Sequence, residues 1–144
     1  MSTHPAAPRH KRLRRMAFLL LLGVFLIVLG LEPDLFNLDR SPVVGFVQLA
    51  VFLIGLAFVC LGGYVGFAVP RGEERTIAAD IGLRLVATGY VIAFVSGMAD
   101  VLGFGTETFP EVPSFGILQQ TGVIVGEIVI ALGFLLVAIP RKQR

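Results

Sequence analysis

The chain has 144 residues, of which 56% are hydrophobic and only 15% are charged, and its formal net charge is +2. A water-soluble domain needs more charge than this to cover its surface, so the composition predicts a protein embedded in lipid. One cysteine, Cys60, excludes a disulfide framework and a CxxC redox pair within one chain. Both histidines, His4 and His10, lie in the polar N-terminal segment. We therefore expect no cofactor and no metal site inside the membrane.

The N-terminal part of the chain is polar and then becomes abruptly apolar. Residues 1–12, which include Pro5 and Pro8, are expected to be a disordered basic tail, and the run RHKRLRR occupies residues 9–15. A basic cluster directly before an apolar segment is typical of a topology signal that contacts anionic lipid. The alternative is a nucleic-acid-binding arm, but the span that follows favours the lipid contact. Residues 13–31 are predicted to be an uncleaved signal-anchor helix, because no small-x-small cleavage pattern follows them.

Three further apolar runs follow, at residues 42–69, 77–103 and 114–139, and residues 141–144 form a basic tail. The expected N-caps are hydroxyl residues at the start of each run, where their side chains would accept from the first turn: Ser41, Thr76 and Ser114. Short connections force neighbouring helices to run antiparallel. Residues 13–140 are therefore predicted to be an all-α membrane domain with four transmembrane helices in an up-down bundle.

The basic residues are unevenly distributed between the connections. Of the 12 Lys and Arg residues, all except Arg40 lie in the N-terminal segment, in the C-terminal tail or around the connection between the second and third spans. The other two connections are acidic. The positive-inside rule then predicts a multi-pass protein of the cell membrane with both termini in the cytoplasm.

The second and fourth spans resemble each other at a constant offset of 71 residues. The matching positions are Gly45 with Gly116, Gln48 with Gln119, Gly55 with Gly126 and Gly62 with Gly133. This pattern predicts a 2+2 repeat of two helical hairpins that enter the membrane from the same side. The alternative is chance similarity between apolar, glycine-rich strings.

One carboxylate, Glu127, lies near the middle of the last span, where the first copy of the repeat has Leu56. An ionised acid at mid-bilayer costs on the order of 3 kcal/mol. Glu127 is therefore expected to be neutral and to face the bundle, a partner or a cavity. One interpretation is a proton- or cation-responsive site, with Asp100 and Gln119 or Gln120 at its outer mouth. The other is a neutral acid that fixes helix register or docks a partner subunit.

Small residues spaced along the spans allow helix backbones to approach closely in lipid, although membrane helices are glycine-rich in general. The expected helix-packing positions are five glycines: Gly62, Gly66, Gly122, Gly126 and Gly133.

No Ser-His-Asp set, HExxH or P-loop is present, so we expect the chain not to be an enzyme. Our leading hypothesis is a scaffold or accessory subunit of a larger membrane complex, or a homo-oligomer, with no nucleic-acid partner. The alternative is a small proton- or cation-coupled transporter or channel-like protein that uses Glu127.

Overall fold

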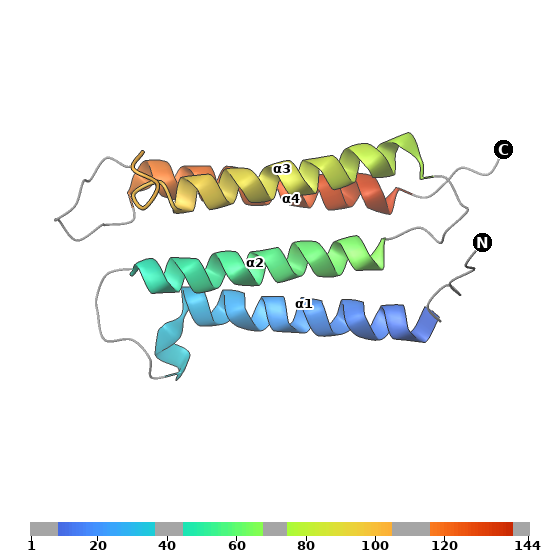
Figure 1. Cartoon of the computed structure of the whole chain (residues 1–144), viewed down its shortest axis with the longest axis horizontal. Coiled ribbons are helices and arrows are strands. Elements are labelled where there is room, and N and C mark those ends of the chain that lie inside the picture. Colours follow the sequence, from blue (N-terminus) through green and yellow to red (C-terminus); the bar gives the residue numbers. More distant parts are fainter. Residues whose placement is uncertain (1–8, 37–44, 68–74, 105–115, 140–144) are drawn as a thin grey trace, which may run out of the picture.

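The computed structural model describes residues 9–36, 45–67, 75–104 and 116–139 (Figure 1). These residues form four long α-helices and one short 3-10 helix, and no strand is found among them: α1 (Arg9–Leu31), η1 (Pro33–Phe36), α2 (Phe46–Gly66), α3 (Ile77–Gly97) and α4 (Ile117–Ala138). All four α-helices are long and apolar enough to cross a membrane. The prediction of an all-α membrane protein with four such helices is confirmed.

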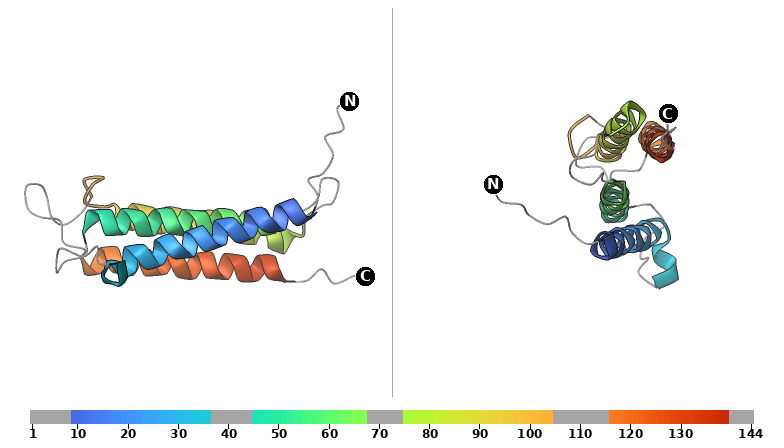
Figure 2. Two further views of the ribbon diagram at one scale, coloured as in Figure 1. Left: turned by 90° about the horizontal axis from the view of Figure 1, so that it is seen from below. Right: turned by 90° about the vertical axis from the view of Figure 1, so that its right-hand side faces the viewer.

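The four helices are arranged as two hairpins, α1 with α2 and α3 with α4 (Figure 1). Seen along the helix axes, α2 lies between α1 and the α3–α4 pair, so α1 is covered mainly on the side that faces α2 (Figure 2). The chain alternates direction from one helix to the next, which places the start of α1 and the end of α4 at the same end of the bundle. An up-down bundle is what short connections require.

Each hairpin is closed by two glycines whose backbones touch. A Cβ atom added at Gly55 would lie 2.8 Å from the carbonyl oxygen of Gly23, and one added at Gly126 would lie 2.6 Å from that of Gly89. These separations leave no room for a side chain. Association of helices in lipid depends on such close packing, because lipid tails are as apolar as the side chains. Glycine therefore holds α1 on α2 and α3 on α4.

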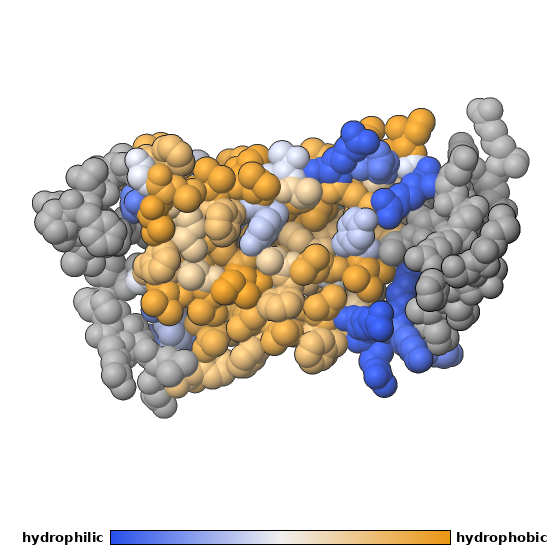
Figure 3. All heavy atoms as spheres, viewed as in Figure 1, coloured by the Kyte–Doolittle hydropathy of each residue, from blue (hydrophilic) through white to orange (hydrophobic). Residues whose placement is uncertain are grey.

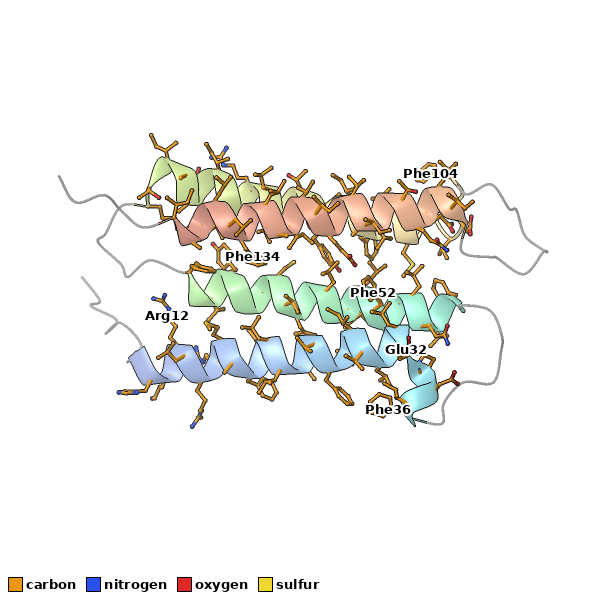
Figure 4. All side chains as sticks on the ribbon, turned by 180° about the vertical axis from the view of Figure 1, so that it is seen from behind. Arg12, Glu32, Phe36, Phe52, Phe104 and Phe134 are labelled. Carbon is orange, nitrogen blue, oxygen red and sulfur yellow. The ribbon has the colours of Figure 1, made fainter. Side chains whose placement is uncertain are left out.

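The two hairpins meet where α2 faces α3 and α4, and far fewer residues touch there than within either hairpin. Leu53, which is 1% exposed, packs against Gly97 and accepts a hydrogen bond of 3.4 Å from the hydroxyl of Tyr90. Further along, the ring of Phe134 fills the space beside Gly63 (Figure 4). We call these five residues the hairpin seam. It closes the core but binds the hairpins together less tightly than glycine binds each pair of helices.

The sequence predicts hydroxyl caps at three helix starts. At the start of α3 the hydroxyl of Thr76 fills this role and accepts from the backbone N–H of Ala79 at 3.1 Å. The start of α4 is instead fixed by Gln119, whose side-chain oxygen accepts from the backbone N–H of Gly116 at 2.9 Å. Gln48 makes the same bond to Gly45 at 2.8 Å, so α2 begins at Phe46. A glutamine at the third position of a helix that reaches back to the cap residue satisfies one of the unpaired N–H groups there. Ser41, Pro42 and Ser114 lie outside the described residues.

The first residue of α1 and the last residue of α3 also differ from the prediction. α1 begins at Arg9 rather than residue 13, because Lys and Arg are good helix formers and the Arg12 guanidinium donates to the carbonyl oxygen of Gly66. α3 ends at Gly97 rather than residue 103. The chain then turns, and Gly103 has a φ of +81°, a value that L-residues rarely adopt.

Basic side chains gather at one end of the bundle, while the rest of the visible described surface is mostly apolar (Figure 3). Some of these bases contact the protein itself: Arg84 pairs with Asp80 at 3.0 Å, and the guanidinium of Arg75 lies 5.6 Å from the ring centre of Tyr64. Lys11, Arg14 and Arg15 are exposed at the start of α1. The structure thus separates a basic end from an apolar belt, which is the pattern that a membrane requires.

Candidate functional site

Glu127 lies halfway along α4, on the side of that helix that faces α2. Val123, four residues earlier, is buried in the core, and Phe134, seven residues later, reaches α2 in the hairpin seam. Residues four and seven apart share one face of a helix. Glu127 is half-buried. The structure therefore places this residue on the side of α4 that borders the hairpin seam, about halfway along the helix.

Tyr90 and Cys60 are the other reactive groups at this depth. Tyr90 directly follows Gly89, and Glu127 directly follows Gly126, so both residues flank the point where α3 and α4 touch. The hydroxyl of Tyr90 donates to the carbonyl oxygen of Leu53 on α2, and Tyr90 and Cys60 both pack against the buried core cluster that includes Val123. A phenol and a thiol therefore lie against the same core as the Glu127 side of α4. Nothing in the sequence placed Cys60 in this region.

Glu127 has no charged partner among the residues that the structure describes. The ion pair found there joins Arg84 to Asp80 near the basic end. Two hydroxyls of α3 have contacts elsewhere: Thr88 donates to the carbonyl oxygen of Arg84 at 2.9 Å, and Ser96 packs over Gly122. An acid placed at mid-membrane without a cation favours its neutral form.

Replacing Tyr90 with phenylalanine is expected to lower the free energy of unfolding by about 1 kcal/mol, because one hydrogen bond across the hairpin seam is lost while the ring remains. The measurement is thermal unfolding in detergent. The matched control is Tyr64→Phe, which removes the same hydroxyl group at another position. Tyr64 is 48% exposed and makes its contact with Arg75 through the ring. Equal effects of the two variants would contradict a role for the Tyr90 hydroxyl.

The other polar residues predicted to accompany Glu127 lie at the opposite end of α4 from the basic side chains. Gln119 and Gln120 are seven or eight residues earlier, roughly 10–12 Å along the helix. Gln119 is buried and caps its own helix, while Gln120 is exposed. Asp100 follows the end of α3. The structure therefore does not bring these residues together with Glu127 into one site.

Asp100 lies in the turn that follows α3. The residue is half-buried, and its Oδ1 is buried without a hydrogen-bond partner within the described ranges. An unpaired buried oxygen of this kind is uncommon and costs free energy. Its chain neighbour Ala99 lines a cavity at that end of the bundle, which is separate from the Glu127 site.

The five glycines expected at helix contacts all face other elements of the same chain. Gly62 and Gly66 meet α1, at Leu20 and Met16, and the three glycines of α4 meet α3: Gly122, Gly126 and Gly133. These small-residue faces are consequently occupied within the chain and offer no surface to a partner helix.

No group of three or more His, Cys, Asp or Glu residues that could hold a metal ion occurs in the part of the chain that the structure describes. The fold and the site together define a small multi-pass integral membrane protein with one carboxyl group at mid-depth. Comparisons with protein-family models, with curated proteins and with solved structures find no match.

Proposed function

We propose that this chain is a small proton- or cation-coupled transporter or channel-like protein, in which Glu127 takes up a proton or a small cation at the hairpin seam. The observation that carries the proposal is the position of Glu127 on the α2-facing side of α4, two helical turns from the contact between Phe134 and Gly63. An ionisable residue inside a membrane is expensive to keep, and such residues commonly mark ion or substrate pathways.

The packing of the helices supports this proposal. Each hairpin is locked by glycine contacts, while fewer residues join one hairpin to the other. Two rigid hairpins that meet at a weaker contact can shift against each other with little loss of packing, and transporters of several folds move repeats in this way. A change in the charge of Glu127 would then favour one position of the hairpins over another, because an ionised carboxylate requires water or a cation beside it.

The experiment is proton flux into liposomes that contain the purified chain and a trapped pH-sensitive dye. We expect the wild type to dissipate an imposed pH gradient, and Glu127→Gln, which preserves shape but cannot ionise, to reduce the rate at least tenfold. Asp34→Asn is the matched control, because it is the same kind of change at an exposed position outside the bundle. The same liposomes, loaded with a Na⁺- or K⁺-sensitive dye, test small cations.

A second candidate, a scaffold or accessory subunit of a larger complex, is favoured by the uncovered side of α1. Large apolar residues there are exposed over the length of the helix: Phe18, Leu21, Val24, Phe25 and Val28. If wild-type liposomes leak no faster than empty ones, while a membrane partner co-purifies and is lost when Leu21 and Val24 are replaced by alanine, the transport proposal fails and the scaffold takes its place. Neither function requires a catalytic group.

We also propose that the basic end of the bundle faces the cytoplasm of a cell whose plasma membrane holds the protein, with Lys11, Arg14 and Arg15 against anionic lipid. In a Cys60→Ser background, a membrane-impermeant maleimide is expected to label Asp34→Cys in intact cells. His10→Cys should react only after the cells are permeabilised. The reverse labelling pattern would overturn this orientation.

A further inference from the structure

A cavity of about 520 Å³ lies between the end of α3 and the start of α4, at the end of the bundle away from the basic residues. Its lining includes Val95, Ser96 and Ala99 from the α3 side and Ile117 and Gln119 from α4. Phe104, labelled in Figure 4, contributes to the lining from the turn that follows α3. This volume is within the range of small-molecule sites. We call it the outer pocket.

The walls of the outer pocket are mainly apolar, with a few polar groups at fixed positions. Gln119 is 8% exposed, and its side-chain oxygen is occupied by the backbone N–H of Gly116. That bond holds the amide in place, so the side chain cannot turn away from the pocket without uncapping α4. Ser96 is likewise held, because its side chain packs over Gly122. Apolar walls with a few fixed polar groups favour a ligand that has a large apolar body.

The charge around the outer pocket favours a cation. Asp100 is not itself a lining residue, but it directly follows the lining residue Ala99 in the chain, and its buried Oδ1 has no hydrogen-bond partner among the described residues. Glu32 and Asp34 lie at the same end of the bundle, whereas the described Lys and Arg residues all lie at the other. A buried carboxylate oxygen without a donor attracts a positively charged or hydrogen-bonding group.

We propose that the outer pocket binds an amphipathic organic cation, whose apolar body lies against Val95, Ile117 and Phe104 and whose charged group lies toward Asp100. This inference is independent of Glu127, which lies deeper along α4. The cationic group can belong to a free lipophilic ion or to the ammonium of a phospholipid headgroup, and the two sources can be separated by experiment.

The test uses the absence of tryptophan from the sequence. Leu118→Trp places a single fluorophore at the pocket, and Leu135→Trp places one on an exposed position nearer the other end of the same helix. With the purified full chain in a neutral detergent, tetraphenylphosphonium is expected to change the emission of Leu118→Trp saturably and that of Leu135→Trp not at all. Triphenylphosphine oxide, which is neutral, should bind at least tenfold more weakly.

Three further variants in the Leu118→Trp background test the charge of Asp100, the space beside Ala99 and, as a control, an exposed position outside the pocket. Asp100→Asn should weaken tetraphenylphosphonium binding at least tenfold, and Ala99→Phe should abolish it, while Val101→Phe, an exposed position outside the lining, should leave it unchanged. Circular dichroism and gel filtration establish that each variant is folded. If Ala99→Phe does not fold, the comparison of the cation with the neutral compound still decides the proposal.

Competition by an added ethanolamine phospholipid would identify a lipid headgroup as the source of the cation, and lack of competition would identify a free ion. A response without saturation, or one that is equal at both tryptophans, overturns the proposal of a site. Equal binding of the cation and the neutral compound, together with no effect of Asp100→Asn, overturns the proposal that the site selects a positive charge.

Discussion

Replacement of Gly126 by leucine is expected to separate α3 from α4 and to lower the free energy of unfolding by about 3 kcal/mol or more, at the upper end of what overpacking costs. A Cβ atom at this position would lie 2.6 Å from both the carbonyl oxygen of Gly89 and the backbone nitrogen of Ala93. Backbone atoms cannot rotate away as a side chain can, so the helices themselves must move apart. Every contact along the α3–α4 interface weakens when they do.

The measurement is a thermal ramp in detergent with a thiol-reactive dye, which labels Cys60 as the bundle opens, because Cys60 is the one cysteine in the sequence and is partly buried. Ala131→Leu is the control: the same side chain is added on the same helix, at an exposed position. Gly55→Leu should reproduce the effect in the first hairpin, since Gly55 contacts Gly23 in the same manner. If Gly126→Leu is as stable as Ala131→Leu, the claim that a close backbone contact at Gly126 holds α3 against α4 is wrong.

Replacement of Glu127 by leucine is expected to raise stability or leave it unchanged, while flux is lost. An ionised acid at mid-bilayer costs on the order of 3 kcal/mol, and a neutral one costs less, so removal of the carboxyl group relieves up to a few kcal/mol. The matched position in the first hairpin is Leu56, which is buried and apolar. An apolar residue at this depth is therefore compatible with the packing of such a hairpin.

Stability is measured by the same thiol ramp and flux by the liposome assay. Glu127→Gln serves as the reference, because it keeps the shape and the hydrogen-bonding capacity of the side chain. If Glu127→Leu unfolds at a markedly lower temperature than both the wild type and Glu127→Gln, the carboxyl group is a structural anchor. In that case the proposal that Glu127 is a transport site fails, and the register-fixing interpretation replaces it.

The two hairpins share features that the sequence offset of 71 residues had indicated. Gln48 and Gln119 make the same bond at the start of α2 and α4, and Gly55 and Gly126 both lie at a close backbone contact. These correspondences agree with the predicted repeat, while a duplication of one ancestral hairpin stays a prediction. Glu127 stands out against this background because Leu56 occupies the matched position.

Local pattern predicted the helix bodies better than their ends. A hydroxyl residue before an apolar run commonly marks a helix start, yet the cap residues of α2 and α4 are glycines. The competing cap uses a side chain from inside the helix, Gln48 or Gln119, and a glutamine inside a membrane span can equally link two helices. A glutamine in the first turn can do either, and the sequence contains nothing that separates the two uses.

The sequence by itself determined that this protein is a four-helix membrane protein, because the length and hydropathy of each span are local properties that any tertiary arrangement must satisfy. It also determined that Glu127 lies at mid-depth, since depth follows from position along the span. Only the tertiary structure decided which way each helix face points. In the structure Glu127 lies on the side of α4 that borders the hairpin seam, and the glycines contact helices of the same chain. An oxygen of Asp100 is buried near the outer pocket. Small and polar residues are visible in a sequence, but their partners depend on helix rotation, which is set by packing between segments far apart in the chain.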